Sequence, residues 1–152
     1  MPEDPWPGHR CPLDVMPTND LLERLAQVLA DATDERPVQV FLKENPHLLS
    51  GLLPPGGAAW YFLIEIESPT KSLLTAKGLP SAKLVEAMGQ VRDWRSWIRT
   101  NIAYAQATLG FRGLTAEATA FVVMGRRASI SVKHAARYRE LSDDRTKVMT
   151  YD

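Results

Sequence analysis

Two glutamates that stand two positions apart in an apolar stretch are the residues of this sequence best suited to chemistry. Glu65 and Glu67 belong to the run Trp-Tyr-Phe-Leu-Ile-Glu-Ile-Glu at 60–67, whose composition is typical of a buried central strand. Because side chains alternate along a strand, both carboxylates point to the same face at its carboxyl end. Carboxylates in such a place are paired or bind a cation, so the pattern indicates a metal or catalytic site. The alternative is that the strand emerges into water and both acids are solvated.

Composition limits the classes of function that are open to the chain. The 152 residues suffice for one domain, and 18 basic residues cancel 18 acidic ones. Any binding of DNA must therefore come from a local patch. Cys11 is the only cysteine, which excludes a disulfide framework and a cysteine-rich zinc site. Neither a membrane span nor a secretory signal is visible, so we expect a cytoplasmic protein without a membrane partner.

The elements that must position the two acids follow from the apolar periodicity. Five prolines in residues 1–17 predict a flexible leader, and residues 18–152 are expected to form one domain. The first predicted helix starts at residue 18 or 19. Three further helices are predicted at 37–49, 81–107 and 135–141. The other predicted strands are 119–124 and 147–151, with 129–132 extending or pairing beside the first of these. Helices between buried strands predict an α/β sandwich with a parallel or mixed sheet.

Residues 41–152 contain an ordered set of motifs that covers about three quarters of the chain. The pieces are Phe41-Leu42-Lys43-Glu44-Asn45-Pro46, Leu63-Ile64-Glu65-Ile66-Glu67-Ser68-Pro69, Glu86-Ala87-Met88-Gly89-Gln90-Val91, Val122-Val123-Met124-Gly125-Arg126-Arg127 and Thr150-Tyr151-Asp152. With them the sequence resembles the C-terminal nuclease domain of Shedu anti-phage defence proteins. That domain belongs to the PD-(D/E)XK superfamily of restriction-like nucleases.

The resemblance implies a fold, an activity and a cofactor. The fold is a restriction-endonuclease-like α/β sandwich with a central mixed sheet flanked by helices, and the activity is metal-dependent DNA endonuclease. In that superfamily, acids on two neighbouring strands hold Mg²⁺ or Mn²⁺, usually with a lysine two positions after the second acid. Glu65 takes the place of the second acid and Glu67 the place of the lysine, so both are expected to be catalytic metal ligands.

Further roles are implied by the same resemblance. Gln90 matches a helix glutamine that positions the catalytic site, and Glu44 matches a first-helix acid that joins the metal shell in some relatives. Arg126 and Arg127 follow a strand, and Lys71 lies in a loop, so all three suit contacts to DNA phosphates. The alternatives are a solvated strand end for the arginines and a helix-surface amide for Gln90. The partners implied are DNA and further copies of the chain, with no small-molecule cofactor.

Two departures from the family pattern concern the metal site. The connector at 52–59 contains no acid, so a hairpin strand with its metal-binding aspartate is missing before the glutamate strand. Glu67 also removes the usual cation, which Lys71, Lys77 or Lys83 would have to replace.

These departures leave two alternatives to an active nuclease. One is a catalytically degenerate nuclease fold that acts as a nucleic-acid-binding or assembly module. The other is an interaction domain in which Glu65 and Glu67 pair with Arg92 or Arg95. Relatives of this kind assemble, and the candidate interfaces lie on the long helix, either at the apolar stripe of Leu84, Met88 and Val91 or at its aromatic stripe.

Overall fold

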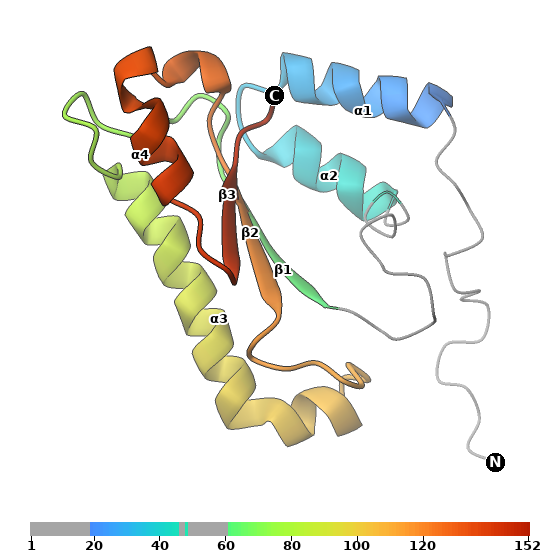
Figure 1. Cartoon of the computed structure of the whole chain (residues 1–152). Helices are drawn as coiled ribbons and strands as arrows, with labels where there is room; N and C mark the ends of the chain where they lie inside the picture. Colours follow the sequence, from blue (N-terminus) through green and yellow to red (C-terminus); the bar gives the residue numbers. More distant parts are fainter. Residues whose placement is uncertain (1–18, 46–47, 49–60) are drawn as a thin grey trace.

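The computed structural model describes residues 19–45, 48 and 61–152, and Figure 1 draws the remaining residues as a thin grey trace. The predicted leader at 1–17 and the acid-free connector at 52–59 lie outside the described residues. None of the helices in the described part of the chain is both long and apolar enough to cross a membrane.

Helices and strands follow the predicted order. The structure contains α1 (Asn19–Asp31), α2 (Arg36–Glu44), β1 (Phe62–Ile66), α3 (Ala82–Ala107), β2 (Thr119–Val123), two single turns of 3₁₀ helix (Arg127–Ser129 and Val132–His134), α4 (Ala135–Glu140) and β3 (Thr146–Met149). The strand predicted at 129–132 is wrong, because this part of the chain forms the two 3₁₀ turns and the bend between them. α2 also ends earlier than predicted, because Asn45 leaves helical geometry just before Pro46.

The strands form a parallel sheet in the order β1-β2-β3. The predicted α/β class is confirmed. The sequence pattern left a parallel or a mixed sheet open, and the described strands form the parallel one rather than the mixed sheet that the resemblance implied. Parallel pairing follows from the connections, since α3 joins β1 to β2 and α4 lies between β2 and β3. Glu65 stands beside Val122, and the backbone N–H of Glu67 donates to the carbonyl of Val123 at 2.9 Å. The extended chain therefore continues past β1 as far as Glu67.

Helices cover both faces of the sheet. Figure 1 shows α3 and α4 on one face and α1 and α2 on the other. The main core lies on the α3 side, where Leu84 and Val91 pack with residues such as Ala120, Val122 and Met124. Leu84 and Val91 are almost completely buried there, so the candidate oligomer interface on this stripe is wrong. Trp94 packs against the same core, while Trp97 is exposed.

The loops at the carboxyl edge of the sheet are tied together by backbone contacts. Gly125 follows β2 with a φ of +67°, and a Cβ atom at this position would lie 2.6 Å from the carbonyl oxygen of Lys71. Its N–H donates to the carbonyl of Ser68 at 3.2 Å, and its carbonyl accepts from the N–H of Tyr151 at 3.0 Å. Glycine is required because any side chain would collide with the loop that follows Glu67.

Tyr151 fastens the chain after β3 to the end of β1. Its hydroxyl donates to the backbone carbonyl of Glu67 at 2.7 Å, and the residue is buried. Burial, more than the nearby acids, raises the pKa of Tyr151 to about 12, so the phenol remains a neutral hydrogen-bond donor. This contact gives the backbone of Glu67 a second hydrogen bond, besides the one that its N–H donates to β2.

Candidate active site

The two strand glutamates lie where β1 meets the first turns of α3. Leu63 of β1 packs against the core beneath α3, so the alternation of side chains places Glu65 on the same face. α3 begins after Ser81, whose hydroxyl accepts the N–H of Leu84 at 3.2 Å and caps the helix. This cap fixes the start of the helix, and with it the side chain of Lys83 next to the strand end.

Glu67 is the buried member of the pair. Its side chain is 7% exposed, and Lys83 Nζ lies 3.2 Å from its Oε1. The same ammonium group lies 3.2 Å from Oε2 of Glu86, one turn further along α3. These hydrogen bonds, first to Glu86 and then to Glu67, raise the pKa of Lys83. Of the three lysines considered as substitutes for the missing cation, Lys83 is therefore the one that reaches the acids.

Glu65 is half-buried, and the pKa of its carboxyl group is strongly raised. Burial is the largest cause that raises its pKa from 4.5 to about 7, followed by the negative charge of Glu67. Lys83 lowers the pKa, whereas the charges of Glu86 and Glu35 raise it. Carboxylates outnumber the ammonium group around Glu65, so its ionised form is disfavoured.

Gln90 provides a hydrogen-bonding partner for Glu65. With its amide nitrogen turned toward the carboxylate, Gln90 Nε2 donates to Oε1 at 2.8 Å and to Oε2 at 3.2 Å. In the opposite amide orientation two acceptors would face each other. The structure thus brings Gln90 to Glu65, where it can fix the orientation of the carboxylate.

The structure does not bring Glu44 to these residues. Glu44 is exposed at the end of α2, whereas Glu35, at the beginning of α2, is the acid of this helix whose charge reaches Glu65. Nine residues of helix separate the two acids by about 13 Å. Sequence reasoning placed Glu35 in the break between two helices, and no local pattern distinguished it from a solvated acid.

The predicted phosphate-binding residues have different surroundings. Arg126 donates through Nη2 to the carbonyls that end α1, at 2.6 Å for Leu29, 3.1 Å for Ala30 and 3.3 Å for Ala32. It therefore caps a helix. Arg127 and Lys71 have exposed side chains without an ion pair to any described residue. Their contacts to DNA stay predictions.

The predicted pairing of the two acids with Arg92 or Arg95 is wrong for Arg95. Its guanidinium instead donates to the carbonyls of Ala118 and Arg145 and to the hydroxyl of Thr146, at 3.2, 2.7 and 3.0 Å. Arg92 is exposed and forms no ion pair with the part of the chain that the structure describes. The cation that pairs with Glu67 is Lys83.

The donor set limits what kind of metal the site can hold. Among the described residues there is no group of three His, Cys, Asp or Glu side chains that could hold a metal ion. Mg²⁺ is commonly bound by one or two carboxylates, with water and substrate phosphates completing its shell. Glu65 and Glu67 fit that arrangement, and they do not fit a site closed by protein ligands alone.

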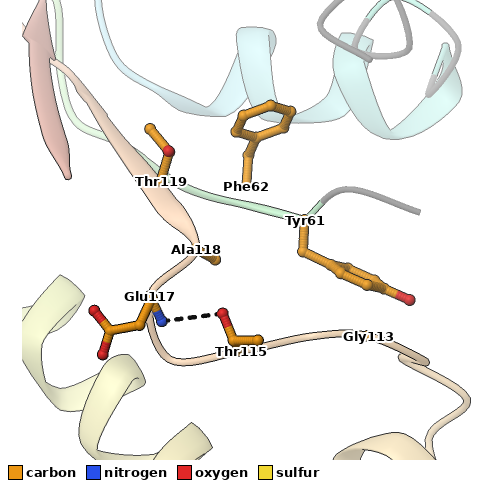
Figure 2. Close-up of a pocket in the computed structure, with 7 residues that line it drawn as sticks. All are labelled: Tyr61, Phe62, Gly113, Thr115, Glu117, Ala118 and Thr119. Carbon is orange, nitrogen blue, oxygen red and sulfur yellow. Dashed lines mark hydrogen bonds between the residues drawn. The ribbon is translucent and has the colours of Figure 1, made fainter. Parts of the chain in front are cut away.

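A separate pocket lies at the opposite, amino edge of the sheet. Figure 2 shows it between the start of β1 and the segment before β2, with a volume of about 260 Å³. The Tyr61 hydroxyl donates a hydrogen bond to the carbonyl of Arg112 at 3.0 Å. The carboxylate of Glu117 points toward the neighbouring helix rather than into the pocket (Figure 2). Ligands of parallel sheets bind at the carboxyl ends of strands, so this pocket is not the catalytic candidate.

Comparison with known families decides where the chain belongs. The family model described as Shedu protein SduA, C-terminal, matches residues 32–152. The chain belongs to this Shedu family. The match begins nine residues before the first motif quoted above and includes the whole sheet, both strand acids and α3. No curated protein matches the chain.

Proposed function

We propose that this Shedu domain is a metal-dependent DNA endonuclease of a phage-defence protein, built on a shortened restriction-endonuclease-like sandwich. Membership of the Shedu family supports the defence context. The observation that carries the chemistry is Glu65, an acid with a pKa of about 7 that lies beside Glu67 and Gln90 at the carboxyl edge of a parallel sheet.

The electrostatics of the site favour a divalent cation. Glu65, Glu67 and Glu86 face one ammonium group, that of Lys83, and a DNA phosphodiester would add further negative charge. Mg²⁺ or Mn²⁺ held by oxygens of Glu65 and Glu67 would relieve this excess. When bound, the ion would activate a water for attack on the phosphodiester and neutralise charge in the transition state.

The protein side chains divide the remaining work. Gln90 holds the Glu65 carboxylate in one orientation by donating to both of its oxygens. Glu67 stands where related nucleases have a lysine. Lys83 supplies the missing positive charge, and it reaches the site from α3 instead of from the strand. Placed beside the scissile phosphate, this ammonium stabilises the negative charge that develops during hydrolysis.

A cleavage assay on plasmid and linear DNA tests the proposal. Wild type is compared in Mg²⁺ and in Mn²⁺ with Glu65→Gln, which keeps the side-chain shape, and with Glu23→Gln, which removes an exposed acid on α1. We expect Glu65→Gln to lose about 100-fold or more of the cleavage rate while it unfolds cooperatively. Glu23→Gln should cleave like wild type. A folded Glu65→Gln that cleaves at the wild-type rate would contradict the proposal.

One observation favours a second candidate, a nuclease fold that binds nucleic acid without cutting it. Among the described residues no group of three His, Cys, Asp or Glu side chains could hold a metal ion, and Lys83 already engages both Glu67 and Glu86. This candidate predicts no hydrolysis by folded wild type, together with salt-dependent binding of DNA that weakens in Arg127→Ala. Arg126 is unsuitable for this test because its removal would also uncap α1.

A further inference from the structure

A polar hollow lies at the carboxyl edge of the sheet, between the loop that follows β1 and the segment that follows β2. Its volume is about 360 Å³. The polar lining consists of four hydroxyl groups, an ammonium group and an imidazole, from Ser72, Thr75, Ser129, Ser131, Lys133 and His134. No carboxylate takes part in the lining. We call this site the Lys133 hollow; it opens at the same edge of the sheet as Glu65 and Glu67.

The two segments that form the Lys133 hollow are basic in a chain that is neutral as a whole. Residues 68–80 and 124–139 contain no acid, although the full sequence has as many acids as bases. Seven lysines and arginines lie in these segments: Lys71, Lys77, Arg126, Arg127, Lys133, Arg137 and Arg139. Lys133 is exposed and forms no ion pair with any described residue, so its charge is available to a ligand. The nearby Asp152 accepts the backbone N–H of Arg127.

His134 forms a fixed wall of the hollow. Its Nδ1 lies 3.1 Å from the hydroxyl oxygen of Ser131, and its ring packs on Gly78. A Cβ atom at Gly78 would lie 2.8 Å from His134 Cδ2, and the glycine has a φ of +76°. The turn that carries Gly78 is closed by its N–H, which donates to the carbonyl of Thr75 at 2.9 Å. The wall is therefore built by contacts between the two segments rather than by one loop alone.

We propose that the Lys133 hollow binds a phosphate group. Hydroxyl and ammonium donors without an opposing carboxylate suit an anion rich in oxygen acceptors, and they disfavour a cation or an apolar ligand. The phosphate can belong to a DNA backbone or to a small phosphorylated molecule. The DNA source rests on the proposed nuclease function: the loop begins at Ser68, directly after Glu67, so a strand anchored here would be held beside the strand acids.

Two titrations on the full chain, both in EDTA so that no DNA is cut, test this proposal. Inorganic phosphate is titrated while the ring signals of His134 are followed by NMR. Binding of a labelled DNA duplex is measured by fluorescence anisotropy at several salt concentrations. Lys133→Glu is compared with Lys43→Glu, which makes the same charge change at an exposed lysine on α2, outside the hollow. Thermal unfolding verifies that both variants fold.

We expect saturable shifts of the His134 signals that Lys133→Glu abolishes and Lys43→Glu preserves. DNA affinity should fall at least fivefold further in Lys133→Glu than in Lys43→Glu, and the salt slope should decrease by about one. Phosphate binding without DNA binding would support the hollow with a small phosphorylated ligand and would count against the proposed nuclease. Cleavage of DNA by wild type, combined with equal behaviour of the two variants in both titrations, would overturn the hollow and leave the nuclease standing. Absence of the phosphate shifts would also overturn it.

Discussion

At the amino edge of the sheet, charged side chains pair with one another. The carboxylate of Glu117 is shared by two arginines, Arg145 and, at 3.7 Å, Arg99. All three side chains are at least half exposed, and cations outnumber the acid. The neighbouring pocket has no second acid among its lining residues.

At the carboxyl edge the imbalance is reversed. One ammonium group, that of Lys83, serves Glu67 and Glu86, and Glu65 beside them is held only by an amide. Glu67 is also buried, so its charge is poorly screened by water. The difference teaches that the fold gives one acid two cations at the amino edge and leaves three acids beside one cation at the carboxyl edge. The excess of acids at the carboxyl edge is the observation on which the proposed cation site rests.

The largest expected contrast in stability between the two edges comes from their glycines. Gly125→Ala combines a positive φ with a collision against the Lys71 carbonyl, and should lower the free energy of unfolding by about 2–4 kcal/mol. Gly113 at the amino edge also has a positive φ, but no atom lies within 4 Å of its Cβ position. Gly113→Ala should therefore cost only about 1 kcal/mol. Urea denaturation measures both, and equal losses would mean that the loop after Glu67 yields easily.

A smaller effect is expected from removing one cation at each edge. Lys83→Met leaves buried Glu67 without its ion pair. We therefore expect the cleavage rate to fall by at most about tenfold and the melting temperature to decrease. Arg99→Met breaks a long, exposed pair and should change stability by less than about 0.5 kcal/mol. Cleavage kinetics and thermal unfolding compare the variants. If both substitutions had the same small effect, Lys83 would be an ordinary surface lysine.

The smallest effect is a pH dependence that belongs to Glu65. Its pKa is raised from 4.5 to about 7 in the folded chain, so the unfolded chain loses this proton first as pH rises. Stability from this group is complete below pH 4.5 and declines as pH rises toward 7, by about 1 kcal/mol after solvent screening. Urea midpoints between pH 5 and 8 in EDTA should show the decline in wild type. Glu65→Gln should lack it, whereas Glu117→Gln should retain it.

Much of the fold was readable from local pattern. Apolar periodicity located α1, α3 and the three strands within a few residues, and the Asn45–Pro46 step explains why α2 stops where it does. The direction of the sheet was not readable, because a run of apolar residues looks the same in parallel and mixed sheets. The segment at 129–132 has strand-like composition, yet it forms 3₁₀ turns because the chain must turn back toward α4.

Only those site residues could be predicted that lie on the apolar strand or match a motif of the family. Alternation placed Glu65 and Glu67 on one face, and the family pattern selected Gln90. No rule of spacing could choose Lys83 among three lysines, since its reach depends on where the Ser81 cap starts the helix. Arg126 is the converse case: a strand-end arginine that resembles a phosphate ligand is used by α1, which lies 94–97 residues away in sequence.

The hydrogen bond from Tyr151 to the Glu67 carbonyl has a consequence for the order in which the molecule is made. Its partners are 84 residues apart in sequence. A ribosome therefore releases Glu67 long before the tyrosine that holds its backbone carbonyl, and long-range contacts of this kind form late. The end of β1 therefore acquires this backbone contact only after β3 has docked.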